Sequence, residues 1–226
     1  MLELLPDAPT FLLLVLLGGW SAIDGTSFGQ FMISRPFVSA TLGGLVMGDP
    51  ISGAAVGVVL EAFHLTILPI GAARYPEGGP PSVVVGALAA VSSPVAADLL
   101  TGLVFYLVWS EVCGGSVRAL RKINVRLFIR DGRLDFDPAA LERRHLAAIG
   151  FDFLRGTALV ATGMAILAAL LHLARGSWGL GDSVPQIVVA AAVAGLMGSA
   201  LRLFGDRKRL FVAGAIGGLL VLLARG

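Results

Sequence analysis

The sequence predicts an all-α polytopic membrane protein that combines transmembrane helices with re-entrant or broken half-helix hairpins. Of its 226 residues 56% are hydrophobic and 14% are charged, whereas soluble domains carry about 25% charged residues. Glycine contributes 30 residues, and small residues let membrane helices approach closely and break. Several apolar segments are shorter than the roughly 20 residues that a spanning helix needs. The chain is therefore expected to insert in the lipid bilayer in spans and half-spans.

Charge and cysteine content narrow the functional classes. The formal net charge of +2 does not indicate nucleic-acid binding, since basic residues in a membrane protein mainly set its topology. The single cysteine, Cys113, excludes an internal disulfide and a multi-cysteine metal cluster. Glu3 and Asp7 stand where a cleavable signal peptide needs basic residues, so we expect insertion through the chain's own helices.

The first apolar segment, Thr10–Ile33, has a polar and glycine-rich middle. Pro9 is suited to open a helix there. One continuous helix and a helix with an unwound middle are both compatible with the pattern. We favour the broken form, because Asp24, Gly25 and Gly29 fall close together where a continuous helix has little use for them.

The next stretch contains two short apolar segments, Phe37–Met47 and Ile51–Ile70, joined at Gly48-Asp49-Pro50. The first is too short to cross a bilayer and the second is barely long enough. Glu61 and His64 lie near the middle of the second segment. A carboxylate there is costly in lipid and marks a candidate site facing protein or water. Pairs of broken half-helices form the midplane site of many transporters.

The remaining apolar runs predict the other helices. Ser82–Cys113 is either one tilted span or a half-helix followed by a span, with Pro94 as the break or kink. Tyr106 and Trp109 near its end are typical of a membrane interface. Phe153–Leu173 and Val184–Leu203 are predicted to cross, while Leu210–Leu223 either crosses with tilt or packs as a re-entrant piece.

A hydrophilic segment separates the two halves. Residues 118–144 contain eight basic and four acidic side chains, and this excess predicts a cytoplasmic loop. Asp137-Pro138 is expected to start a surface helix in it. We therefore expect one membrane domain over 1–226. Its parts are a hairpin region with the site at 1–113, a basic loop at 114–150 and C-terminal helices at 151–226.

Four side chains are candidates for a ligand site: Asp24, Gln30, Glu61 and His64. Carboxylate and amide oxygens accept hydrogen bonds from sugar hydroxyls. Asp24 and Gln30 could instead satisfy a broken helix end. Glu61 could instead form a structural pair with Arg35 or Arg74, and His64, three residues on, could share the site or simply hold the carboxylate.

The other polar residues are not among the candidates for this ligand site. Asp49 is expected to cap the turn between the half-helices, and Asp98 is an intramembrane carboxylate without an assigned role. The sequence has no recognisable catalytic triad, HExxH motif or Walker loop. We expect no catalytic residue, no metal site and no cofactor.

The segment Ile23–Ala73 resembles the IIC membrane subunit of the mannose/fructose/sorbose-type sugar phosphotransferase system. The matching features are an acidic residue after Ile23, an Arg-Pro opening a short segment, a Gly-Asp turn, a Leu-Glu end and an Ile-Gly-Ala-Ala. They correspond here to Asp24, Arg35-Pro36, Gly48-Asp49, Leu60-Glu61 and Ile70–Ala73, with Gly71 as a turn residue. Mannose-handling members tend to carry a tryptophan and an asparagine before the last motif, where this chain has Ile67-Leu68-Pro69.

The resemblance implies a sugar permease subunit of the bacterial cytoplasmic membrane that works as an oligomer with a IID membrane partner. Cytoplasmic IIA and IIB subunits would carry the phosphoryl group, so this chain needs no phosphorylated residue of its own. The basic loop would contribute to their docking surface.

Two other functions remain compatible with the residues. An ion- or proton-coupled carrier would use Asp24, Glu61 and Asp98 as ion ligands. A membrane scaffold from an incomplete system would bind a soluble regulator through the basic loop.

Overall fold

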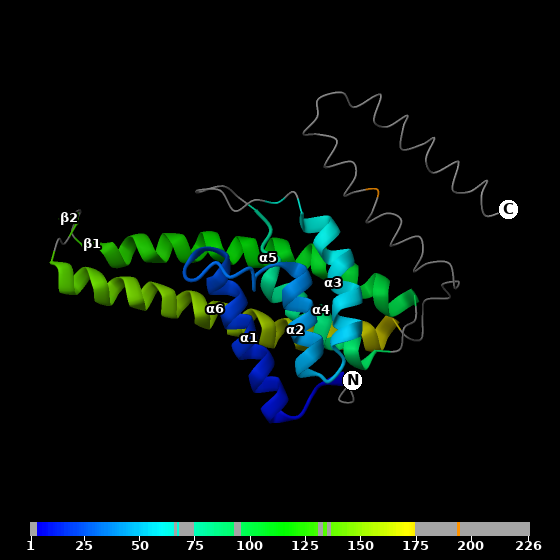
Figure 1. Ribbon diagram of the computed structural model, residues 1–226. Helices are drawn as coiled ribbons and strands as arrows, with labels where there is room; N and C mark the ends of the chain where they lie inside the picture. The colour runs from blue at the N-terminus through cyan, green and yellow to red at the C-terminus, as the bar shows by residue number, and fades with distance from the viewer. Residues whose placement is uncertain are drawn as a thin grey trace, which may run out of the picture.

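The computed structural model describes residues 4–65, 67, 75–92, 96–130, 133–134, 137–174 and 194. The described part contains six α-helices and one two-stranded β-hairpin (Figure 1). Three of these described helices are long and apolar enough to cross a membrane: α1 (Ala8–Thr26), α5 (Ala96–Phe128) and α6 (Pro138–Ala174). The predicted class, a multi-pass helical membrane protein with additional short helices, is confirmed.

The predicted hairpin of short helices is also present. Helix α2 (Pro36–Val46) and helix α3 (Pro50–His64) have 11 and 15 residues, and each begins with a proline in its first turn. Gly48 takes a φ of +93° in the turn between them, a conformation that favours glycine. Helix α3 ends at His64, short of the expected Ile70; Gly71 and the rest of that motif lie outside the described residues.

Helix α1 corrects one expectation. It runs unbroken through Asp24 and Gly25 and ends at Thr26, and Phe31–Ile33 does not resume a helix. The chain turns away after the helix instead, with positive φ angles at Gly29, Gln30 and Met32. Pro9 lies in the first turn, as predicted.

The run from Ser82 onward forms two helices, which confirms the alternative of a half-helix followed by a span and not that of one tilted span. Helix α4 (Gly79–Val91) is followed by α5 after a break that begins at Ser92. Pro94 lies outside the described residues. The same is true of the predicted spans Val184–Leu203 and Leu210–Leu223.

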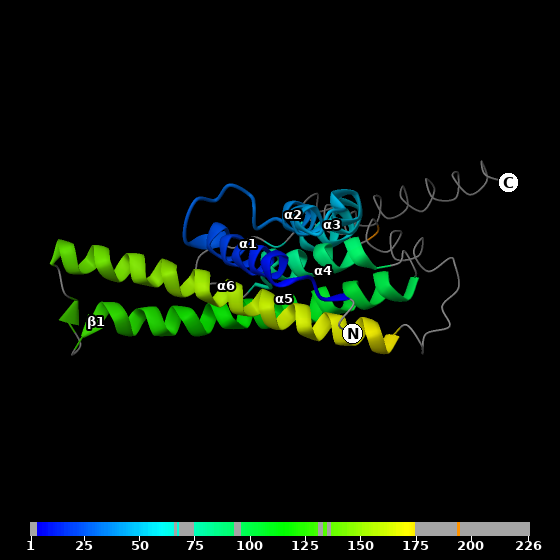
Figure 2. The same cartoon turned by 90° about the horizontal axis from the view of Figure 1, so that it is seen from below.

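The basic segment is not a loop, contrary to expectation. Helix α5 continues to Phe128, strand β1 (Ile129–Arg130) pairs antiparallel with β2 (Arg133–Leu134), and α6 starts at Pro138. We call residues 118–150 the arm, because the two helices extend side by side well beyond the other helices (Figures 1 and 2). The expected surface helix and the expected span at Phe153–Leu173 are parts of this one helix, and the expected boundaries at 113/114 and 150/151 fall inside helices.

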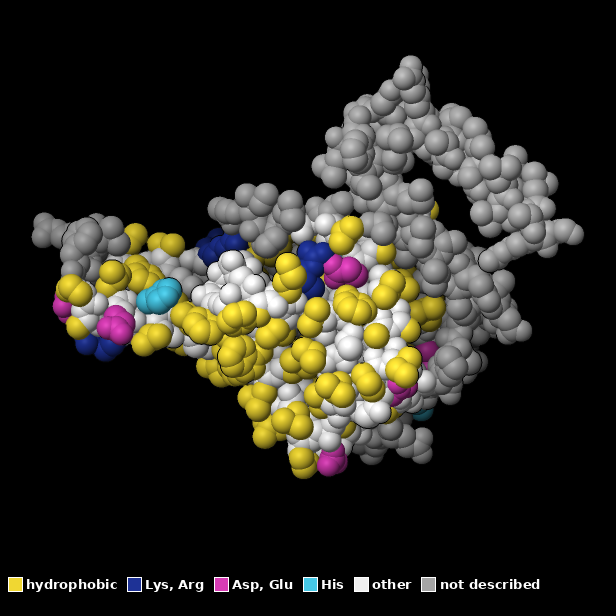
Figure 3. Space-filling model, in the orientation of Figure 1, with side chains coloured by type: hydrophobic (Ala, Val, Ile, Leu, Met, Phe, Trp, Pro, Cys, Tyr) yellow, Lys and Arg dark blue, Asp and Glu magenta, His cyan; other side chains and the backbone are white. Residues whose placement is uncertain are grey.

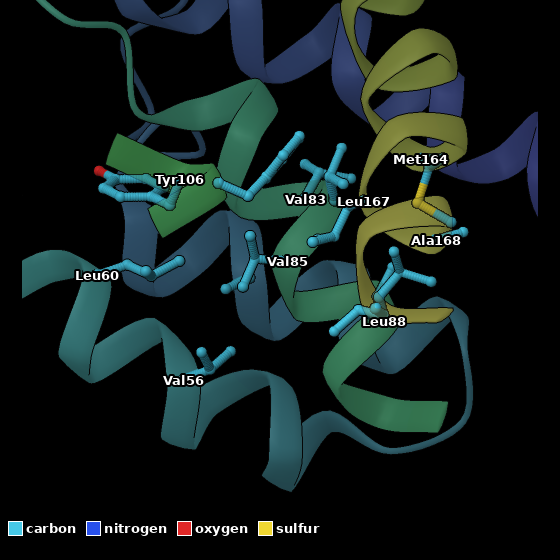
Figure 4. Packing of buried hydrophobic residues seen from close by; sticks show 14 of the residues in the cluster. Val56, Leu60, Val83, Val85, Leu88, Tyr106, Met164, Leu167 and Ala168 are labelled. Carbon is cyan, nitrogen blue, oxygen red and sulfur yellow. The ribbon is translucent and has the colours of Figure 1, made fainter. Parts of the chain in front are cut away.

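Helix α4 is the centre of the core. Every residue from Gly79 to Leu88 is buried, and Figure 4 shows Val83, Val85 and Leu88 between side chains of α3, α5 and α6. A Cβ atom on Gly86 would overlap the carbonyl oxygen of Ala40 on α2, so this glycine allows the two backbones to touch. Apolar side chains dominate the outer face seen in Figure 3, as expected for a surface in contact with lipid.

Candidate functional site

A cavity of about 720 Å³ lies between the end of α1 and one face of α5. We call it the large cavity. The α5 wall consists of Val117, Leu120, Arg121 and Asn124, whose spacing places them on one helical face. The opposite wall includes Asp24, Ser27 and Gln30 and extends to Arg35. Its volume is within the range of about 300–1,000 Å³ common for small-molecule sites.

A second cavity, of about 90 Å³, continues from the first toward α3 and α4. This small cavity is lined by Ser21, His64 and Glu77, among others. Gly25, Thr26, Ser34 and Arg35 line both cavities. The two spaces therefore adjoin at the loop between α1 and α2, and Arg35 stands at their junction.

Glu61 holds Arg35 at that junction. Its carboxylate forms an ion pair with the Arg35 guanidinium and accepts the Phe37 N–H at 3.1 Å. Phe37 is in the first turn of α2, where the helix dipole favours an anion. Among the described residues neither cavity lining includes Glu61. The alternative in which Glu61 pairs with Arg35 is confirmed, and Arg74 lies outside the described residues.

Asp24 organises the loop after α1. Its carboxylate is almost completely buried and accepts the Phe31 N–H at 2.5 Å and the Ser34 N–H at 2.9 Å. Asp24 is thus bonded within the protein, as in the structural alternative, but it satisfies N–H groups of the loop and not a broken helix end. Gln30 is exposed and lines the large cavity together with Asp24.

His64 faces the small cavity in a fixed orientation. Its Nδ1 is 2.9 Å from the Tyr106 hydroxyl, and a Cβ atom on Gly78 would come within 2.9 Å of its Cε1. Tyr106 is fully buried in the protein core. Burial is possible because the hydroxyl has this partner.

A buried ionic network next to the cavities was not foreseen. The Arg155 guanidinium donates to Glu77 at 2.6 and 2.7 Å, to Asp152 at 2.9 Å and to Ser116 at 2.8 Å. Asp152 also accepts a hydrogen bond from Ser27 after α1. Burial raises the pKa of Glu77, and the Arg155 guanidinium opposes that shift. The sequence signal was the Asp152/Arg155 pair, three residues apart in an apolar helix.

Asp49 and Asp98 lie outside the linings described for the two cavities. Asp49 accepts the N–H groups of Ile51 and Ser52 and the Ser52 hydroxyl, so its predicted capping role is confirmed. These bonds hold the pKa of Asp49 below its usual value. Asp98 is buried in the first turn of α5, and neither described cavity lining includes it.

The site thus brings three of the four candidates to the walls of adjoining cavities: Asp24 and Gln30 to the large one and His64 to the small one. Glu61 is connected to both through Arg35. The walls combine hydroxyl, imidazole, amide and guanidinium groups, which suits a neutral ligand rich in hydroxyls. Within the described residues there is no group of three or more His, Cys, Asp or Glu side chains that could hold a metal ion.

Comparisons with known proteins found similarity in sequence and in fold. Residues 9–108 match the family described as PTS system sorbose-specific IIC component. The PTS system sorbose-specific EIIC component of Lacticaseibacillus casei is 32% identical over 73 residues, which make up 31% of this chain and 26% of that protein. The match thus spans about a quarter of the relative's length.

A solved structure described as "Structure of membrane protein" has a TM-score of 0.65 over 97% of this chain and 96% of its own, at 17% identity. This likeness shows the fold alone. The resemblance to IIC subunits of the mannose/fructose/sorbose-type phosphotransferase system is confirmed by the sequence matches, which lie within residues 9–108.

Proposed function

We propose that this chain is the sugar-translocating IIC subunit of a mannose-type phosphoenolpyruvate-dependent phosphotransferase system. The observation that carries the proposal is the pair of adjoining cavities with Arg35 at their junction. They lie where a spanning helix ends beside a hairpin of short helices, the arrangement in which many transporters bind substrate.

In this proposal a hexose or amino sugar lies across the junction of the cavities. His64 and Thr26 bind hydroxyls on one side, and Gln30 binds on the other. Asp24 and Glu61 act mainly as positioning residues, because their carboxylates hold the loop and Arg35 in place. The small cavity alone, at about 90 Å³, is below the usual size of a ligand site, so the sugar also occupies part of the large cavity.

The proposed partners follow the same family. A IID subunit would complete the membrane part, in an oligomer within the bacterial cytoplasmic membrane, and IIA and IIB would relay the phosphoryl group. The arm is the proposed docking surface for IIB. It exposes Ile123 and Leu146 by 50% and 59%, and the exposed basic side chains of its outer part, Arg126 and Arg143, suit an acidic partner.

The ion-coupled carrier is less well supported. Asp24 accepts two backbone N–H groups, and Glu61 faces a guanidinium and a further N–H. These carboxylates are thus directed at donors within the protein instead of at a bound cation.

The test is sugar binding by the chain purified with its IID partner, measured by calorimetry for mannose, fructose and sorbose. Glu61→Gln is expected to weaken binding at least tenfold, because Arg35 loses its anionic partner. Asp49→Asn is the matched control, since it makes the same carboxylate-to-amide change at the far turn of the same hairpin. Equal affinity of both variants and the wild type would contradict the proposed site. Transport driven by an ion gradient without phosphoenolpyruvate would favour the carrier.

A further inference from the structure

The α5 wall of the large cavity carries a cation, Arg121, that has no ion-pair partner among the described residues. Arg121 lines the cavity, and its guanidinium carbon lies 5.8 Å from the centre of the Tyr75 ring. In the part of the chain that the structure describes, Arg121 forms no ion pair. Stacking on an aromatic ring orients the guanidinium plane and leaves its N–H groups for another acceptor.

The acidic groups of the same cavity are already engaged. Asp24 accepts the two backbone N–H groups of the α1–α2 loop, and Asp152 pairs with Arg155. Arg35, the second cation in the wall, is paired with Glu61. Among the charged side chains that the structure describes in this lining, Arg121 is therefore the cation whose N–H groups are not used in an ion pair.

A neutral acceptor lies one helical turn from Arg121. Asn124 Oδ1 is buried and has no hydrogen-bond partner among the described residues, which is unfavourable unless a ligand or water supplies a donor. Because Arg121 and Asn124 are three residues apart and both line the cavity, they present a donor fork for an oxyanion and an acceptor for a hydroxyl on one face.

We propose that the large cavity is a binding site for a phosphorylated sugar, with Arg121 holding the phosphate and Asn124 a sugar hydroxyl. The assignment to a sugar phosphate rests on the proposed function, which requires that the product leave as a phosphate ester. The junction of the two cavities then favours the neutral sugar, and the α5 wall of the large cavity favours its phosphorylated product. The phosphorylated product is thus held at a place away from His64.

The experiment uses the full chain with its IID partner in phosphatidylcholine nanodiscs and measures binding by calorimetry. The probes are inorganic phosphate, mannose 6-phosphate, fructose 1-phosphate and the two parent sugars. We expect each sugar phosphate to bind at least tenfold more tightly than its parent sugar, a difference of about 1.4 kcal/mol. Arg121→Gln should abolish this difference and the binding of inorganic phosphate.

Arg118→Gln is the matched control. It removes the same charge from the exposed side of the same helix, one turn away, outside both described cavity linings, and should leave every affinity unchanged. Asn124→Leu should remove the advantage of the sugar phosphates over inorganic phosphate while inorganic phosphate still binds. Thermal unfolding of each variant verifies that it is folded.

The outcomes separate this inference from the proposed function. Parent sugars that bind while phosphate confers no advantage, or an Arg121→Gln variant that binds as the wild type does, would overturn the inference and leave the permease intact. Binding of phosphate through Arg121 without any binding of sugar would overturn the proposed function. Loss of phosphate binding in phosphatidylglycerol nanodiscs would identify a lipid headgroup as the occupant of the cavity and would overturn its assignment to a sugar phosphate.

Discussion

The guanidinium of Arg155 on α6 donates to both carboxylate oxygens of Glu77, at 2.6 and 2.7 Å. Both side chains are only 10% exposed. The Glu77 N–H also donates to Ser110 O on α5 at 2.9 Å. The segment before α4 is thereby fixed to α5 and α6, and it forms part of the wall of the small cavity.

Replacement of Glu77 by Gln is expected to destabilise the protein strongly. It leaves the Arg155 charge buried with only Asp152 as a counter-ion, and removing one partner of a buried pair costs about 3–5 kcal/mol. Chemical unfolding in detergent measures the change. Glu142→Gln makes the same substitution at an exposed position of the arm and should alter stability by less than about 0.5 kcal/mol. Similar changes in the free energy of unfolding for the two variants would show that the buried Glu77–Arg155 pair does not stabilise the protein.

Replacement of Tyr106 by Phe tests whether His64 needs its fixed orientation. The variant keeps the ring in the core and loses the hydroxyl at 2.9 Å from His64 Nδ1, which should cost about 1 kcal/mol of stability. We also expect weaker binding of the neutral sugar, since His64 lines the small cavity. Ser110→Ala is the control, because among the described residues that hydroxyl bonds within its own helix, to Leu107 O. Sugar affinity that falls equally in both variants would argue against a specific role of Tyr106.

The sequence predicted the α2–α3 hairpin because its signals are local. Gly48 supplies a positive φ, Asp49 caps α3, and Pro50 suits the first turn. Each of these effects acts over three or four residues, so the order of residue types was enough. A pair of Glu61 with Arg35 or Arg74 was one alternative from the sequence, and the structure shows the pair with Arg35.

Other features depend on distant contacts. The arm was expected to be a loop because it is charged, yet charged residues such as Arg and Glu are good helix formers, and the two helices support each other. The Arg155 network combines side chains from Ser27 after α1, from α5 and α6, and from the 75–78 segment, and no local pattern connects them. Asp24 was expected to break α1, but the loop after Thr26 supplies donors for it and the helix continues.

The cap at Asp49 makes the hairpin sensitive to acid. Its bonds to Ser52 and Ile51 lower its pKa in the folded protein. The stabilisation is thus complete above the ordinary Asp pKa of about 3.9 and is lost as the pH falls through the lower folded value. We expect the wild type to be more stable than Asp49→Asn at pH 7, with the difference shrinking below pH ~4.

Unfolding midpoints of both proteins from pH 7 to 3 measure this difference. Asp7→Asn is the control, because Asp7 precedes α1 without a side-chain capping bond, and its midpoint should follow the wild type throughout. A difference between wild type and Asp49→Asn that grew toward low pH would have the wrong sign for a carboxylate that is stabilised in its ionised form.

The close contact of α2 and α4 predicts opposite effects for two glycine substitutions. Gly86→Ala places a Cβ atom against the Ala40 backbone, 2.5 Å from its Cα, and such overpacking costs about 1–3 kcal/mol. Gly150→Ala, on the arm, meets nothing within 4 Å and should stabilise its helix by about 0.4–1 kcal/mol. Because α2 carries Arg35 at its start, Gly86→Ala should also weaken sugar binding, whereas Gly150→Ala should not. Unfolding in detergent measures the stability, and calorimetry measures the sugar affinity. Both should fall in Gly86→Ala. If Gly86→Ala were as stable as the wild type, α2 and α4 would not be in the close contact described here.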